Sequence, residues 1–127
     1  MSTELQRAAY SVLLPAFAGL ELDDAVRRYL QRGGVSILLG ESRDEYLARN
    51  MSFERRRRET QAQFMGIAEQ AAADAGSPVL VAVDQELGGI QRWHRLVPRM
   101  PTDDGLRGLS AEEIEARSYE MASSARV

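Results

Sequence analysis

The segment from Val79 to Arg92 constrains the fold more than any other part of the sequence. Five consecutive apolar residues, Val79 to Val83, predict a β-strand that is buried on both faces, as in a parallel sheet. The apolar run stops at Asp84, where polar residues and then a pair of glycines follow. In α/β folds, polar residues at the carboxyl ends of parallel strands bind ligands. The sequence therefore predicts an α/β fold with a site directly after this strand.

Upstream, hydrophobic periodicity predicts two further strands that alternate with helices. Residues 11–17 and 35–39 are apolar runs of strand length, and Pro15 marks an irregularity or an end in the first of them. Apolar residues between the two runs recur at helical spacing at Leu22, Ala25, Val26, Tyr29 and Leu30. A second helical face spans residues 64–75 and leads to the strand at 79. This β-α-β order predicts about three parallel (β/α) units.

The remaining segments are less regular. Residues 41–50 are polar and predict a loop with one helical turn. The basic run Arg55 to Arg58 lies between two glutamates, and we interpret it as the charged start of a helix. Near the end of the chain, Ser110 and Glu113 form a capping-box pattern that predicts a last helix. Its apolar residues Ile114, Met121, Ala122 and Ala125 are expected to face inward.

The strand-end segment resembles the Asp-Gln-Glu-Gly-Gly-Arg-Val-Gln-Arg signature of glycoside hydrolase family 3, most closely its bacterial β-N-acetylglucosaminidase branch. The residues that match the signature are Asp84, Gln85, Glu86, Gly88, Gln91 and Arg92. Leu87 replaces the first glycine of the signature, and Gly89 replaces its arginine. An alternative alignment treats Leu87 as an insertion and leaves the final arginine unmatched. We prefer the ungapped alignment, because it preserves both Gln91 and Arg92.

The resemblance implies a fold and a set of ligand residues. It predicts that residues 1–127 form part of the N-terminal domain of this family, the first part of a TIM (β/α)8 barrel. By this resemblance Asp84 and then Arg92 bind the sugar, and Gln85, Glu86, Gly88 and Gln91 are possible lining residues. Residue chemistry offers another interpretation of Arg92, as an ion-pair partner of Asp84 or Glu86.

The resemblance also implies that this chain lacks the catalytic groups. Retaining glycosidases need a nucleophilic carboxylate and an acid/base group, and in this family both lie beyond the third strand. We therefore expect no catalytic residue here and no activity of the chain alone. An alternative is that Asp84 and Glu86 replace the two catalytic groups of the family. His94 lacks the family's histidine pattern, and we expect it to be an exposed loop residue.

Composition narrows the remaining possibilities. The chain has no cysteine and one histidine, which excludes disulfides, thiolate metal sites and multi-histidine metal sites within it. We expect no metal and no cofactor. The net charge of -3 and a single short basic run argue against nucleic acid as a partner. No apolar segment is long enough to cross a membrane and the N-terminus lacks a signal-peptide core, so we expect a cytoplasmic protein.

Two functions from different classes follow. In the first, the chain is the N-terminal portion of a family 3-like glycosidase that contributes sugar-binding residues for an N-acetylglucosamine-type carbohydrate. A closed barrel needs eight strands and about 250 residues, so a second chain or a missing C-terminal half would complete it. In the second, it is a degenerate, non-catalytic domain that binds a sugar or a protein, or serves as a scaffold, and forms a homo-oligomer. An unrelated α/β protein that converged on the motif is a third possibility.

Overall fold

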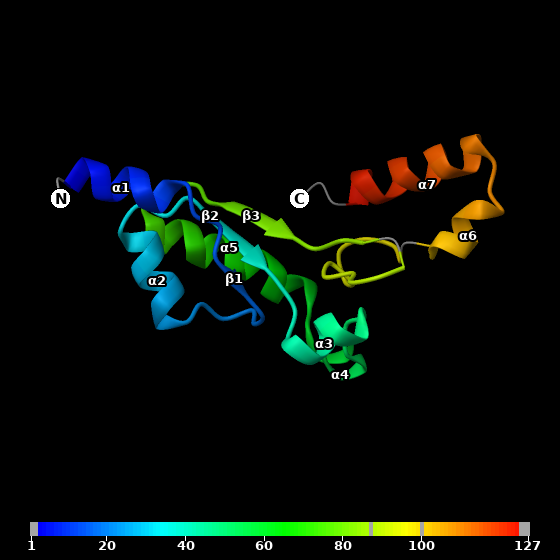
Figure 1. The fold of residues 1–127 in the computed structure, drawn as a ribbon, viewed down its shortest axis with the longest axis horizontal. Coiled ribbons are helices and arrows are strands. Elements are labelled where there is room, and N and C mark those ends of the chain that lie inside the picture. The colour runs from blue at the N-terminus through cyan, green and yellow to red at the C-terminus, as the bar shows by residue number, and fades with distance from the viewer. Residues whose placement is uncertain (1–2, 87, 100, 125–127) are drawn as a thin grey trace. The chain divides into compact units, whose positions relative to one another are not determined.

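The computed structural model describes residues 3–86, 88–99 and 101–124 (Figure 1). The chain divides into two compact units, which are Met1–Glu41 with Thr60–Val83, and Ser42–Glu59 with Asp84–Val127. The described elements of the first unit are α1 (Thr3–Ser11), β1 (Ala16–Phe17), α2 (Asp24–Gln31), β2 (Ser36–Leu39), α5 (Gln61–Ala75) and β3 (Leu80–Val83). Those of the second unit are α3 (Arg43–Ala48), α4 (Phe53–Arg58), α6 (Asp103–Arg107) and α7 (Ala111–Ser124).

The first unit contains a three-stranded parallel sheet in the order β1-β2-β3. Helix α2 connects β1 to β2, so the predicted β-α-β order and the α/β class are confirmed. Strand β1 is shorter than the predicted run 11–17. The carbonyl of Pro15 still accepts a hydrogen bond from the Leu38 N–H at 2.9 Å, but proline has no N–H to donate to a ladder. Regular pairing therefore begins only at Ala16.

The core of the first unit lies on the helix-facing side of the sheet. Ile37 and Leu39 of β2 alternate with half-buried neighbours and are 0% and 1% exposed. Helix α2 packs against α5. The residues these helices bury are Val26, Tyr29 and Leu30 of α2, and Phe64, Ile67 and Ala71 of α5. The two helical faces predicted from periodicity are thus confirmed for these residues, whereas Ala25, which was predicted on the first face, is exposed.

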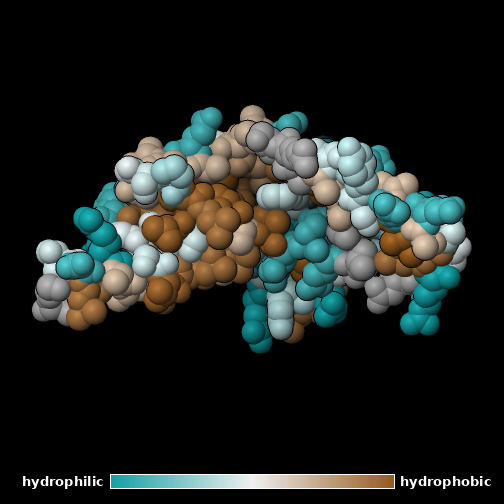
Figure 2. Space-filling view, turned by 90° about the horizontal axis from the view of Figure 1, so that it is seen from above, coloured by the Kyte–Doolittle hydropathy of each residue, from teal (hydrophilic) through white to brown (hydrophobic). Residues whose placement is uncertain are grey.

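The prediction that the third strand is buried on both faces is wrong for the described chain. Leu80 of β3 is 67% exposed, and the other residues of this strand are only half-buried. Further apolar side chains of the first unit are also exposed, namely Leu5, Val12, Leu13, Leu14 and Val35. Figure 2 shows a continuous hydrophobic area over part of this unit. A parallel sheet is buried on both faces only when other elements cover both, and β3 has a neighbouring strand on one side only.

The start of α2 gives a prediction about stability. The Asp23 carboxylate accepts a hydrogen bond from the Val26 N–H at 2.8 Å and caps the helix. We expect Asp23→Ala to lower the free energy of unfolding by about 1 kcal/mol in chemical denaturation followed by circular dichroism. Asp24→Ala, at the next position, is the matched control. It should lower the free energy of unfolding by less than about half as much. Equal effects of the two variants would contradict capping as the cause.

In the second unit, the basic run ends a short helix, whereas the sequence predicted that it begins one. Helix α4 begins after the cap Ser52 and contains Arg55 to Arg58 as its last turn. Glu59 follows in extended conformation, so the helix stops there. Helix α5 then starts with its own capping box, formed by Thr60 and Gln63. Two capping signals within nine positions, at Ser52 and Thr60, therefore separate the helix of the basic run from α5.

Helix α7 begins as predicted, but it buries no described side chain. The Ser110 N–H donates to the Glu113 carboxylate at 2.8 Å, and the Glu113 N–H donates to the Ser110 hydroxyl at 3.3 Å, which confirms the capping box. Ile114 is 37% exposed and Tyr119 is 75% exposed. The expected inward face is therefore wrong for the described residues, while Ala125 lies outside them. None of the described helices combines the length and apolar character needed to cross a membrane.

Candidate functional site

The residues that follow β3 form a tight hairpin within the second unit. Gln85 and Gln91 pair in an antiparallel bridge. Next to this bridge, the backbone N–H of Arg92 donates to the carbonyl of Asp84 at 3.0 Å. The backbone position of Asp84, directly after Val83, is therefore fixed from the returning strand of the hairpin.

Glycines shape the tip of this hairpin. The Glu86 N–H donates to the Ile90 carbonyl at 2.7 Å, which closes the turn. Gly88 has a φ of 67°, in the left-handed region that favours glycine. A Cβ on Gly89 would meet the Glu86 carboxylate and would lie 3.1 Å from the Glu86 Cβ. The conformation of the turn therefore explains why glycine occupies both positions. Leu87, which replaces the first glycine of the family signature, lies outside the described residues.

Asp84 presents a carboxylate that is available for a ligand. The residue is half-buried. Among the described residues, none donates a hydrogen bond to its side chain or pairs with it. Glu86, two positions further, is exposed and forms an ion pair with Arg49 at 3.0 Å. The two carboxylates of the hairpin therefore have different surroundings, and only that of Glu86 is paired with a described cation.

Arg92, the second predicted sugar ligand, is fully buried and bound to a carboxylate. Its side chain is 0% exposed, and it binds Glu59 through Nη1–Oε2 at 2.6 Å and Nη2–Oε1 at 3.2 Å. Burial lowers the pKa of Arg92 and the Glu59 carboxylate opposes this effect, so the guanidinium keeps its proton. The sequence suggested Asp84 or Glu86 as ion-pair partners, but the partner lies 33 positions upstream.

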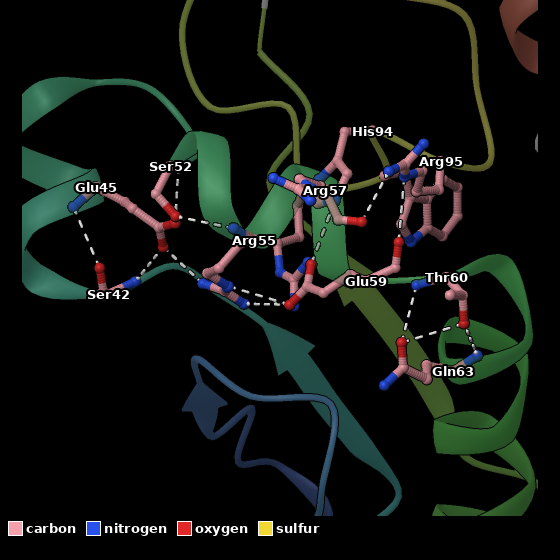
Figure 3. A network of polar contacts seen from close by, with 12 residues as sticks. Ser42, Glu45, Ser52, Arg55, Arg57, Glu59, Thr60, Gln63, His94 and Arg95 are labelled. Carbon is pink, nitrogen blue, oxygen red and sulfur yellow. Dashed lines mark hydrogen bonds and ion pairs between the residues drawn. The ribbon is translucent and has the colours of Figure 1, made fainter.

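The ion pair of Arg92 belongs to a larger network in the second unit, and Figure 3 labels Glu45, Arg55 and Glu59 of this network. Arg55 donates from Nε to Glu59 at 3.0 Å and from Nη1 to Glu45 at 2.6 Å. Glu45 is 3% exposed, so both ends of the chain Glu45–Arg55–Glu59–Arg92 are buried. Arg95 adds hydrogen bonds to the backbone carbonyl of Glu59 at 3.2 Å and to that of Arg57. These contacts tie α3 and α4 to the hairpin.

Glu45 is held by several donors. Its carboxylate accepts hydrogen bonds from the backbone N–H groups of Ser42 and Ser52, each at 2.9 Å, and from Arg55. Burial alone would raise the pKa of Glu45, but these hydrogen bonds outweigh it and lower the pKa to about 2. The carboxylate is therefore ionised throughout the neutral and mildly acidic range.

His94 is not the exposed loop residue that the sequence suggested. Its side chain is 7% exposed, and Nε2 lies 3.3 Å from the Glu59 carboxylate. Burial lowers the pKa of His94, which Glu59 opposes and Arg92 reinforces. The imidazole is therefore neutral at pH 7. Sequence reasoning missed the role of Glu59, and its position at the end of an arginine run was the only available signal.

A cavity of about 380 Å³ in the second unit brings some of the predicted lining residues together. Gly88 and Gln91 line it, whereas Asp84 and Arg92 do not. Gln85 instead supports the hairpin, because its side-chain oxygen accepts a hydrogen bond from the Trp93 N–H at 3.1 Å. The predicted site residues thus lie in three different places. Asp84 lies at the end of a strand, Arg92 forms a buried ion pair, and Gly88 and Gln91 line the cavity.

Comparisons of the chain with known protein families, curated proteins and solved structures found no match. Any proposal about function must therefore rest on the geometry of the residues described above. Among the described residues, no group of three or more histidine or acidic side chains could hold a metal ion. The hairpin offers one carboxylate that no described cation pairs with, that of Asp84, and the second unit has a separate cavity.

Proposed function

We propose that this chain is the N-terminal portion of a family 3-like glycoside hydrolase of the β-N-acetylglucosaminidase type. In this proposal it contributes sugar-binding residues and lacks the catalytic acid/base and nucleophile. The observation that carries the proposal is the carboxylate of Asp84. It directly follows the third parallel strand, and no described residue pairs with it. Carboxyl ends of parallel strands are where α/β enzymes bind ligands.

Asp84 is the direct ligand in this proposal. A carboxylate can accept hydrogen bonds from two adjacent sugar hydroxyls, and such charge-assisted bonds are strong and selective in geometry. Arg92 does not contact the sugar in this proposal, but it holds Asp84 and the hairpin in position. Its N–H fixes the Asp84 carbonyl, and its guanidinium anchors the hairpin on Glu59. The ligand is an N-acetylglucosamine-type carbohydrate.

Hydrolysis requires groups from further polypeptide, because a glycosidase of this kind needs two suitably placed catalytic carboxyl groups or their equivalents. The exposed side of β3 supports this part of the proposal. Leu80 is 67% exposed there, and strand edges readily pair with another strand. The missing part is either covalently joined or a second subunit, and we propose that the assembly acts in the cytoplasm.

Substitution of Asp84 tests the proposed ligand role. We expect Asp84→Asn to weaken binding of N-acetylglucosamine at least tenfold, because it removes the charge from the accepting group. Binding is measured by isothermal titration calorimetry, with the chain alone and with the co-expressed product of the neighbouring gene. Asp44→Asn, at an exposed position of α3, is the matched control and should bind as the wild type does. Unchanged affinity of Asp84→Asn would contradict the proposal.

A second candidate function is a non-catalytic domain that oligomerises and serves as a scaffold or binds a sugar or protein. The exposed apolar side chains of the first unit, with Val12 at 81% and Leu80 at 67%, favour it. Light scattering separates the two candidates. A one-to-one complex with the co-expressed partner and glycosidase activity supports the enzyme portion. A stable homo-oligomer that ignores this partner and cleaves no glycoside supports the scaffold.

A further inference from the structure

The cavity of the second unit is lined by cations. Arg49, Arg56 and Arg99 line it together with the neutral His94, and none of the described residues that line it is acidic. Its volume of about 380 Å³ suits a small ligand. One carboxylate, that of Glu86, lies close enough to pair with Arg49. The described surroundings therefore leave an excess of positive charge at the cavity.

Arg56 is the residue that most clearly lacks a partner of its own. Its Nε is buried, and no hydrogen-bond acceptor for it exists among the described residues. Its neighbours in α4 differ, because Arg55 pairs with Glu45 and Glu59, and Arg58 pairs with Glu54. A buried donor without an acceptor destabilises the fold, because the donor has lost its hydrogen bonds to water. A ligand that brings an acceptor into the cavity would remove this cost.

Arg49 occupies an unusual backbone position at the cavity. It ends α3 with a φ of 49°, and among the described residues it is the only non-glycine with positive φ. Glycine is favoured at such helix ends, because the Cβ of any other residue is strained in the left-handed conformation. Strained positions of this kind cluster at functional sites. An arginine at this position directs a cation to the cavity wall, which glycine could not do.

We propose that this cavity binds the anionic group of a small ligand, a carboxylate or a phosphate. Guanidinium groups donate hydrogen bonds in a planar fork that matches both anions. The site is separate from the proposed sugar site, because Asp84 does not line the cavity.

Titration calorimetry in a buffer free of phosphate tests the proposal with two probes, inorganic phosphate and glucuronate. We expect at least one of them to bind the wild-type chain with a Kd below about 1 mM, and more weakly as salt is added. Arg56→Gln and Arg99→Gln should each weaken binding about tenfold through loss of a charge-assisted hydrogen bond. Arg58→Gln is the matched control, because Arg58 lies in the same helix but does not line the cavity.

The results of this titration either support or overturn the anion-binding proposal. Tighter binding of phosphate or of glucuronate identifies the anion class. Absence of binding by both probes, or equal weakening by Arg58→Gln, would overturn the proposal. Arg99 is exposed, so its substitution keeps the test valid if Arg56→Gln fails to fold, which Trp93 fluorescence would reveal. Asp84→Asn should leave phosphate binding unchanged, which distinguishes this site from the sugar site.

Discussion

Replacing Arg92 by alanine is expected to lower the free energy of unfolding of the second unit by about 3–5 kcal/mol. The guanidinium is 0% exposed and binds both oxygens of Glu59, which is itself 12% exposed. Its removal leaves a largely buried carboxylate with fewer partners and a cavity where the side chain was. Loss of one member of a buried ion pair costs more than loss of a surface pair, because the remaining charge keeps its desolvation penalty.

Trp93 provides the measurement. It is the only tryptophan of the chain and lies in the second unit, so its fluorescence during urea denaturation reports this unit. Arg58→Ala is the matched control, since its ion pair with Glu54 is mostly exposed, with side chains 77% and 67% accessible. We expect this control to change stability by less than about 1 kcal/mol. A similar loss of stability in both variants would show that the buried Arg92 ion pair contributes no more to stability than an exposed one.

A double-mutant cycle separates the ion pair from the packing of the arginine stem. Arg92→Met keeps much of the apolar volume, and Glu59→Gln keeps the shape of the partner. We expect a coupling energy of at least about 1 kcal/mol between the two substitutions, because the residues are in direct contact. Additive effects would contradict the view that Glu59 and Arg92 act as a pair.

Acidification is expected to destabilise the second unit by about 3 kcal/mol as Glu45 becomes protonated. The pKa of Glu45 is lowered from 4.5 to about 2 in the folded chain. A lowered carboxylate pKa stabilises the fold above the unfolded value, and this stabilisation is lost as the pH falls from 4.5 towards 2. The lowered pKa of His94 acts in the same direction, beginning below 6.5.

Urea denaturation followed by Trp93 fluorescence at a series of pH values measures this effect. Glu45→Gln should be less stable than the wild type at pH 7 and should show a smaller decrease between pH 4.5 and pH 2. His94→Gln should remove only the part of the decrease that begins below 6.5. A Glu45→Gln variant with the full wild-type pH dependence would show that another carboxylate is responsible.

Local features of this protein could be predicted from the sequence because neighbouring residues determine them. The capping box at Ser110 and Glu113 depends on groups three positions apart. The buried faces of α2 and α5 follow from helical periodicity, and the parallel β-α-β order follows from the alternation of strand and helix patterns. The position of Asp84 directly after the third strand follows from the abrupt end of an apolar run.

Sequence by itself therefore determined the α/β class, the start of α7 and the strand-end position of Asp84. Only the tertiary structure decided that Arg92 pairs with Glu59, that His94 is buried, that Leu80 is exposed and which arginines line the cavity. The physical reason is distance along the chain. Periodicity and capping depend on residues within a few positions, whereas ion pairs and burial depend on segments that folding brings together from 30 or more positions apart.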